Sequence, residues 1–481
     1  MIGISKSQFF HSSILPILQS SNTPILQYSI LPILQHSILP TLQYSKIHPP
    51  LKIDFKFFSN QLLKSELLRS ASVLITGTVL AQLISILLQP LLRRFFSPET
   101  FGTYSVYLSV VGIIAVISSL RYDDAIVLPG KDKESANVLF LSLLSNFIFN
   151  LVLFLIIMIW GNKIITFLNI PSSFPISILY LIPLSVFLFN TYQSFNYWLI
   201  RKRKYYSVSL NKLVRRGSEG ISQITFALLK NPKGLIFSDI IGQSANVITA
   251  IFQSFRYGFN CKFISVRKTK YVLKKYSDFP RYNLIPALMS TCSFFLPPIF
   301  INKFFSADNT GYFDLAKLLL SIPLALVASS LSNVLLQRIA EKFHNRDSFV
   351  NELKPVLFVV SAICIAELLV ILLFGIGIFK FAFGDNWGIS GEISKIMVWS
   401  FTFNFFVSSF SCVFISMQKI KTYSVWQLFY FLSILSLLFF KNLPFTDFLK
   451  VYVMIEVVCY LVLTAIIVYI IARYEQSLKS S

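Results

Sequence analysis

The chain alternates between long apolar runs and short polar segments. Runs of 18 or more apolar residues recur along it, and each is long enough to cross a bilayer as a helix. A soluble core would show alternating polar faces instead. The pattern therefore predicts an all-α polytopic membrane protein with about twelve transmembrane helices. The predicted spans are residues 71–92, 101–120, 137–160, 176–199, 217–229, 235–255, 282–301, 312–335, 355–379, 393–417, 423–440 and 449–472.

A short pattern occurs twice, each time between two predicted spans. Residues 94–102 read Arg-Phe-Phe-Ser-Pro-Glu-Thr-Phe-Gly, and residues 303–311 read Lys-Phe-Phe-Ser-Ala-Asp-Asn-Thr-Gly. The matching charges, Ser and Gly favour an internal duplication. We interpret the Gly and the acid of each copy as turn chemistry rather than as binding residues.

The longest polar connection, residues 256–281, divides the chain into two halves of six spans. An even number of crossings gives both halves the same orientation, so we expect two six-helix lobes related by a pseudo-twofold axis along the membrane normal. The predicted domains are an N-terminal lobe at 56–260, a basic cytoplasmic inter-lobe loop at 261–280, and a C-terminal lobe with a short cytoplasmic tail at 281–481.

Residues 1–55 are excluded from these lobes. Residues 13–44 repeat with a period of eight, and a Pro in every octet prevents a spanning helix. We expect a low-complexity, disordered extension. The near-identical octets favour translated repetitive DNA or a misplaced start, and a partner-binding arm is the alternative.

The net charge of +22 is concentrated in segments on alternate sides of the predicted spans. The positive-inside rule then places both termini in the cytoplasm. The cytoplasmic segments hold Arg201–Lys204, Lys212, Arg215, Arg216 and the connection 256–281. Because these cations lie at membrane edges, we expect contact with anionic lipid headgroups and not with nucleic acid.

No motif of catalysis or cofactor binding is found in the sequence. The five Cys are scattered, mostly within apolar runs, and no CxxC pair is present, so no metal site or disulfide framework is predicted. No loop after residue 55 is long enough for a folded catalytic domain. We therefore expect neither an enzyme nor a cofactor.

Ionisable residues inside the spans are the best functional candidates, because they are rare in membranes and face a cavity or a partner. Lys317 lies in the eighth span and either faces a cavity or snorkels to the outer interface. Asp314, one turn earlier, is a possible partner. Glu367 and Glu456 lie deep in spans nine and twelve. Asp239, near the end of span six, is interpreted as interfacial.

A charged segment follows the second span, where residues 120–129 read Leu-Arg-Tyr-Asp-Asp-Ala-Ile-Val-Leu-Pro. Arg121, Asp123 and Asp124 predict either a local salt-bridged helix end or charges that gate the mouth of a cavity. The chemistry alone favours neither.

The chain resembles O-antigen and teichuronic-acid-type polysaccharide exporters over about residues 60–475. These flippases have a MATE-like fold and share a superfamily with multidrug–cation antiporters and lipid II flippases. The resemblance is carried by Pro90, 94–104, 121–129, 278–282, 311–317 and Pro323.

The resemblance implies a flippase that moves undecaprenyl-diphosphate-linked oligosaccharides across the bacterial inner membrane by alternating access. It implies a cationic cavity between the lobes, for which Lys317, Arg121 and Arg281 are the candidate substrate-binding cations. The family often has Arg where Lys317 stands, and Lys keeps the charge but loses the bidentate fork.

Further roles follow from the same resemblance. The candidate gating or ion-coupling residues are Glu367, Asp123, Asp124, Asp314 and Glu456. We also expect contact with other membrane proteins of polysaccharide assembly. The alternative function is an ion-coupled multidrug antiporter of the same fold, which would prefer an acidic cavity.

Overall fold

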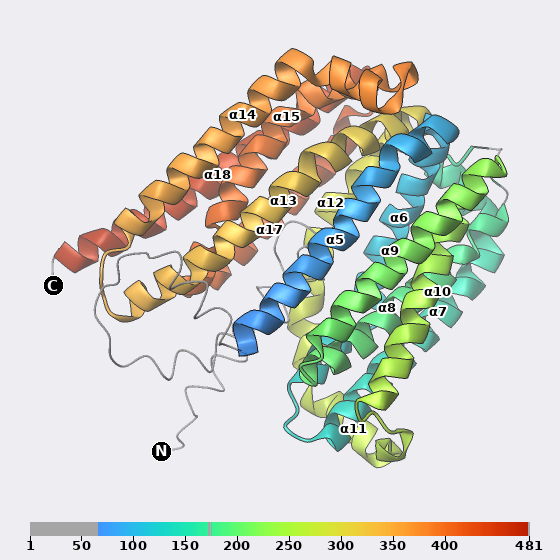
Figure 1. The fold of residues 1–481 in the computed structure, drawn as a ribbon, viewed down its shortest axis with the longest axis vertical. Coiled ribbons are helices and arrows are strands. Elements are labelled where there is room, and N and C mark those ends of the chain that lie inside the picture. The colour runs from blue at the N-terminus through green and yellow to red at the C-terminus, as the bar shows by residue number, and fades with distance from the viewer. Residues whose placement is uncertain (1–65, 172–173, 175, 480–481) are drawn as a thin grey trace.

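The computed structural model describes residues 66–171, 174 and 176–479; most of them are helical, and no strand occurs in that part (Figure 1). This confirms the all-α prediction, whereas the extension at residues 1–55 lies outside the described residues. The long helices of the first half are α5 (Glu66–Phe95), α6 (Pro98–Ser118), α7 (Asp132–Leu168), α8 (Leu181–Arg201), α9 (Tyr205–Leu228) and α10 (Gly234–Arg256). Those of the second half are α12 (Leu284–Phe304), α13 (Ala307–His344), α14 (Val350–Phe383), α15 (Gly388–Phe410), α17 (Ile420–Leu435) and α18 (Phe445–Lys479).

Eleven candidate spans in the described part are long and apolar enough to cross a membrane. They match all of the predicted spans except the fifth, at 217–229. That segment belongs to α9, which begins at Tyr205 and is too polar to meet the same criterion. Since α9 packs against both α5 and α10, it is nevertheless an integral helix of the fold.

The long helices form two groups (Figure 1). We call α5–α10 the N-bundle and α12–α18, which includes the short helix α16 (Cys412–Ser416), the C-bundle. Within the N-bundle, α9 packs against α5 and α10, and α8 packs against α6, α7 and α10. Within the C-bundle, α15 packs against α13, α14 and α18. The main contacts between the bundles are those of α6 with α12 and α13.

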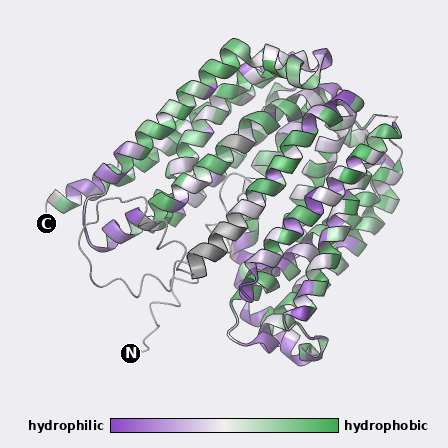
Figure 2. Cartoon of the chain, viewed as in Figure 1, coloured by the Kyte–Doolittle hydropathy of each residue, from purple (hydrophilic) through white to green (hydrophobic). Residues whose placement is uncertain are grey.

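The bundles converge at one end and diverge at the other (Figure 1). The converging end carries the α5–α6 and α12–α13 turns, which are the two copies of the duplicated pattern. The diverging end carries the C-terminal end of α18 and the short helix α11 (Val266–Lys275). Hydrophobic residues cover most of the helix surfaces between the ends, and hydrophilic residues gather at the diverging end (Figure 2).

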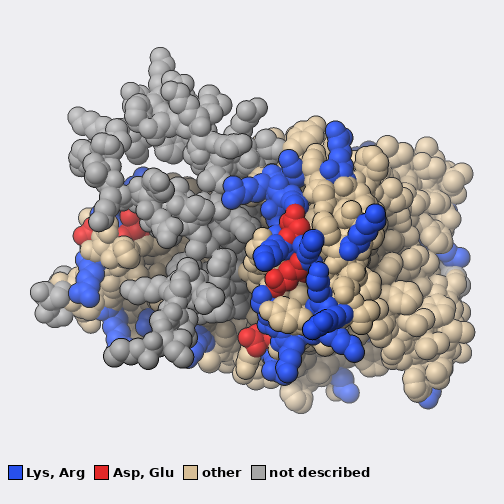
Figure 3. All heavy atoms as spheres, turned by 90° about the horizontal axis from the view of Figure 1, so that it is seen from below, with Lys and Arg blue, Asp and Glu red and all other residues tan. Residues whose placement is uncertain are grey.

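Lys and Arg crowd the diverging end of the N-bundle, around a few acids (Figure 3). This basic face includes α11 and the loops beside it. Its exposed cations are Lys131, Lys133, Arg203, Lys204, Arg256, Lys262, Arg267, Lys268, Lys270, Lys274, Lys275 and Arg281.

The connection between the bundles is largely helical. It contains α11 and a π-helical turn, η5 (Phe279–Asn283), that leads into α12. Asn137 of α7 fixes the start of this connection: its Nδ2 donates to Phe263 O at 2.9 Å and its Oδ1 accepts from Ser265 N at 2.9 Å. The predicted inter-lobe loop is therefore a helix-containing segment attached to the N-bundle.

Candidate functional site

A cavity with both apolar and charged lining residues lies inside the C-bundle. Helices α12, α13, α15, α17 and α18 all contribute to its wall, and it has room for about three water molecules. Its charged residues are Lys317 and Glu456, and its polar residues include Asn404, Tyr430 and Tyr460. An apolar cluster of aromatic and aliphatic side chains surrounds it. The cavity thus brings two charged side chains and several polar groups into a largely apolar cluster.

Lys317 lies inside this cavity and does not reach toward a helix end. Only 8% of the residue is exposed. Its Nζ donates to Phe294 O at 2.7 Å and lies 3.5 Å from the centre of the Phe294 ring. Among the described residues no carboxylate lies within 4.0 Å of Nζ. Asp314, one turn earlier on α13, pairs instead with Arg93 at 2.6 Å. The predicted pairing of Asp314 with Lys317 is therefore wrong, and the ammonium group lacks a direct counter-ion.

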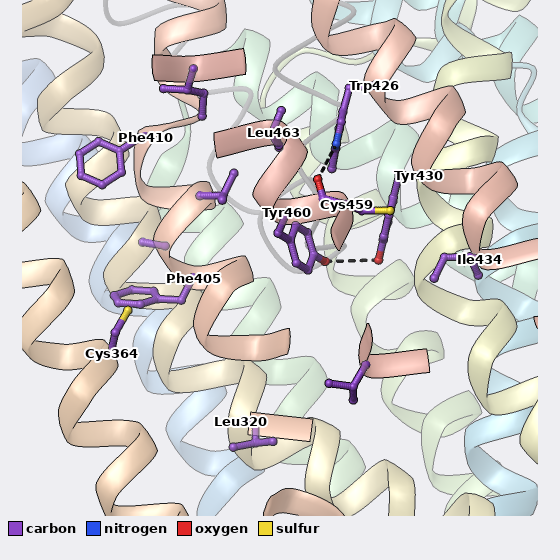
Figure 4. Packing of buried hydrophobic residues seen from close by; sticks show 14 of the residues in the cluster. Leu320, Cys364, Phe405, Phe410, Trp426, Tyr430, Ile434, Cys459, Tyr460 and Leu463 are labelled. Carbon is purple, nitrogen blue, oxygen red and sulfur yellow. Dashed lines mark hydrogen bonds between the residues drawn. The ribbon is translucent and has the colours of Figure 1, made fainter. Parts of the chain in front are cut away.

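Glu456 ends a chain of hydrogen bonds along the cavity wall. Tyr430 donates to Glu456 Oε1 at 2.9 Å, and the hydroxyls of Tyr430 and Tyr460 are 3.3 Å apart (Figure 4). Asn404 Nδ2 donates to the Tyr460 hydroxyl at 2.6 Å, and Ser408 donates to Asn404 Oδ1 at 3.0 Å. One consistent donor direction runs from Ser408 to Glu456. Glu456 was predicted from the sequence, whereas Tyr430, Tyr460, Asn404 and Ser408 were not, since a Tyr within an apolar run looks like ordinary packing.

Glu367 lies apart from the cavity. It is half-buried on α14, and Thr402 of α15 donates to its Oε2 at 3.1 Å. It is not among the residues that line the cavity. The structure therefore places the two deep carboxylates of the C-bundle in different surroundings.

The charged segment after α6 is buried and internally paired. Arg121 contacts Asp124 at 2.8 Å. Tyr197 donates to Asp124 Oδ1 at 2.8 Å, and Ser119 donates to Asp123 Oδ1 at 2.7 Å. All three charges are at most 7% exposed. The salt-bridged helix end, one of the two alternatives that the sequence left open, is present, and the gating role stays a prediction.

The three predicted substrate-binding cations do not form one cluster. Lys317 alone lines the cavity. Arg121 is in the N-bundle, and Arg281 is exposed on η5 at the diverging end. The candidate binding group that remains in the cavity is the single ammonium of Lys317.

The N-bundle contains charged side chains that the sequence analysis predicted at the membrane edges. Arg215 lies within α9, not in a cytoplasmic loop, and contacts Asp239 of α10 at 3.4 Å. Asp239 also accepts from Gln243 at 2.6 Å and is only 1% exposed, so it is buried among the helices, while its interfacial depth stays a prediction. A charge inside a membrane helix needs such a partner, and this partner follows 24 residues later in the chain.

Two further cations of α9 also have partners within the N-bundle. Arg216 pairs with Glu219 at 2.9 Å one turn along the same helix. Lys212 Nζ donates to the hydroxyl of Thr78 on α5 at 2.9 Å. All three basic residues of α9 are half-buried, which corrects their assignment to a solvated loop.

Comparison with protein families gives one match across more than half of the chain. A family model described as "Polysaccharide biosynthesis protein" matches residues 91–391. This region runs from the end of α5 into α15 and includes both copies of the duplicated turn. A search of curated protein sequences gave no match.

Among the solved structures that share the fold are two with a TM-score of 0.65. One is the inward-facing conformation of a multidrug resistance MATE family transporter of the MOP superfamily, with a TM-score of 0.65 and 15% identity over 82% of this chain and 96% of that one. The other is the lipid II flippase MurJ in an inward closed conformation, with a TM-score of 0.65 and 13% identity over 81% of this chain and 86% of that one. The MATE-like fold predicted from the sequence is confirmed.

Proposed function

Since the chain belongs to the polysaccharide biosynthesis protein family, we propose that it moves an undecaprenyl-diphosphate-linked oligosaccharide across the bacterial inner membrane by alternating access. It is a multi-pass membrane transporter and not an enzyme, because its family and its structural neighbours are transporters or flippases. The lipid-linked saccharide as the transported substrate is the part of this proposal that goes beyond the family match. We place the basic diverging end on the cytoplasmic side of the membrane, in accord with the positive-inside rule.

The buried ammonium of Lys317 carries the proposal. A buried cation without a direct counter-ion is costly unless a ligand or a hydrogen bond compensates it. Here one backbone carbonyl and one aromatic face do so, which leaves donors of the ammonium group available to an anion. A diphosphate or an acidic sugar supplies that anion. Hydroxyl and amide groups of Tyr430, Tyr460 and Asn404 in the same wall suit the polar part of a glycan.

Replacing Lys317 tests this function. Lys317→Ala should abolish most surface glycan while membrane abundance stays normal, and Lys317→Arg, which keeps the charge, should retain much of it. The matched control is Lys303→Ala, since Lys303 stacks on Phe167 with Nζ 3.3 Å from the ring centre at the converging end. Normal surface glycan in Lys317→Ala would remove Lys317 from the mechanism.

A multidrug antiporter of the same fold is the second candidate, and the buried carboxylate of Glu456 favours it. A carboxylate in a cavity attracts cationic drugs, but here it shares the cavity with Lys317, which opposes a second cation. The two functions differ in phenotype. A deletion strain with normal glycan and raised drug susceptibility, restored by the parent and not by Glu456→Gln, would favour the antiporter.

A further inference from the structure

The converging end is built from the duplicated turn, whose two copies begin α6 and α13. Ser97 caps α6 by accepting from Thr100 N at 3.3 Å, and Ser306 caps α13 by accepting from Asn309 N at 3.1 Å. Ser97 and Ser306 are matching positions of the two copies. Each cap fixes the first turn of its helix, so the copies share local structure as well as sequence.

The two copies also contact each other through their glycines. A Cβ atom built on Gly102 would overlap the carbonyl oxygen of Ala307, and one built on Gly311 would overlap the carbonyl oxygen of Pro98. Pro98 and Ala307 are again matching positions, so each copy presents the same pair of groups to the other. The contact is reciprocal, as around a twofold axis. Only glycine permits helix backbones to approach this closely.

An ion pair lies directly beside this contact and joins the bundles. Arg93, at the end of α5, contacts Asp314 of α13 at 2.6 Å, and its Nη1 donates to Gly311 O at 3.3 Å. The side chain of Arg93 is only 1% exposed. Separation of the bundles here would break this ion pair and the hydrogen bond to Gly311 O, so the closed arrangement is favoured by both contacts.

Aromatic rings from both bundles enclose the same guanidinium. Its central carbon lies 3.6 Å from the ring centre of Phe101 and 4.6 Å from that of Trp387. Trp387, between α14 and α15, also donates from Nε1 to Arg93 O at 2.7 Å. These rings shield the guanidinium from water and add cation–π contacts to it, whereas the Asp314 side chain stays 27% exposed.

We propose that the duplicated turn is a symmetric latch that closes the converging end. Gly102 and Gly311 set how closely the bundles approach, and the Arg93–Asp314 pair with Trp387 holds them there. Opening this end during transport breaks the glycine contact and the ion pair together, because packed interfaces switch between discrete states. The inference rests on the chain being an alternating-access transporter and not on the identity of its substrate.

Spin labels across the converging end measure this closure. One label replaces Leu229, which is 69% exposed at the end of α9, and the other replaces Phe381, which is 88% exposed on α14. The background chain has its five cysteines replaced. The parent should give a short-distance population. Gly102→Leu and Gly311→Leu should each abolish it, because leucine displaces the opposing carbonyl.

Gly377→Leu is the matched control, since nothing lies within 4 Å of a Cβ atom at this α14 position. It should keep the distances of the parent. Arg93→Ala leaves both glycines in place and should shift part of the population to longer distances. Parental distances in folded Gly102→Leu, or an effect of only one of the two glycines, would overturn the latch. Where neither leucine variant folds, parental distances in Arg93→Ala would overturn it. The labels need no substrate, so this result is independent of the flippase proposal.

Discussion

The two bundles fill their interiors in different ways. In the N-bundle, amide and hydroxyl side chains join neighbouring helices: Asn190 Nδ2 donates to Ala115 O at 2.7 Å, and Ser118 donates to Asn146 Oδ1 at 2.9 Å. In the C-bundle a single large cluster of aromatic and aliphatic side chains fills the interior (Figure 4). The N-bundle therefore combines smaller hydrophobic clusters with many polar contacts between helices, whereas one large hydrophobic cluster dominates the C-bundle.

This difference changes the meaning of a buried polar residue. Between membrane helices the apolar surroundings supply little driving force, so association relies on close packing and on hydrogen bonds. A polar group in the N-bundle is one of many structural contacts. In the C-bundle, Glu456 and Lys317 share one cavity inside an apolar cluster, and packing alone does not require them. A functional role is thus the better explanation there.

Removing a charge from the N-bundle should have the largest effect on stability. Asp239→Leu leaves Arg215 without its partner, and we expect a loss of about 3–5 kcal/mol in the free energy of unfolding. Unfolding in detergent, followed by helical circular dichroism, measures the loss. The same change at Asp447, which pairs with Lys450 in an exposed position, should cost less than about 1 kcal/mol.

A second variant separates the pair from its surroundings. Arg215→Leu with Asp239→Leu should recover most of the loss, because no unpaired charge then remains. If the double variant is as unstable as Asp239→Leu alone, the polar interior of the N-bundle does not depend on this pair.

The sequence predicted the parts of the molecule that depend on local pattern. Span length, the all-helical class and the position of the duplicated turn follow from apolar runs and matched residues. The start of α9 was missed because Arg215 and Arg216 read as solvated, whereas their partners, Asp239 and Glu219, become visible only once α9 and α10 are packed. The tyrosines of the cavity were not predicted, because the sequence does not show which hydrogen-bond acceptor lies beside each hydroxyl in the folded protein.

The packing of the C-bundle should show an intermediate effect. The ring of Trp426 stacks on Tyr430 at 5.4 Å, and its Nε1 donates to Cys459 O at 3.0 Å. Trp426→Phe removes volume and this hydrogen bond, and we expect a loss of about 1–2 kcal/mol in the same unfolding measurement. Trp399→Phe, at a 46% exposed position of α15, is the control and should stay within about 0.5 kcal/mol of the parent. Equal losses in the two variants would contradict a packed C-bundle.

The smallest change in stability should accompany a functional loss. Tyr430→Phe removes one hydroxyl from the chain that ends at Glu456, and Tyr107→Phe removes one from the N-bundle, where it lies 2.5 Å from Ser185 Oγ. Each should cost about 0.6 kcal/mol, the average for a hydrogen bond between membrane helices. Only Tyr430→Phe should lower surface glycan several-fold, because its hydroxyl faces the cavity and that of Tyr107 serves packing. Similar glycan levels in the two variants would show that the polar groups of the C-bundle are as structural as those of the N-bundle.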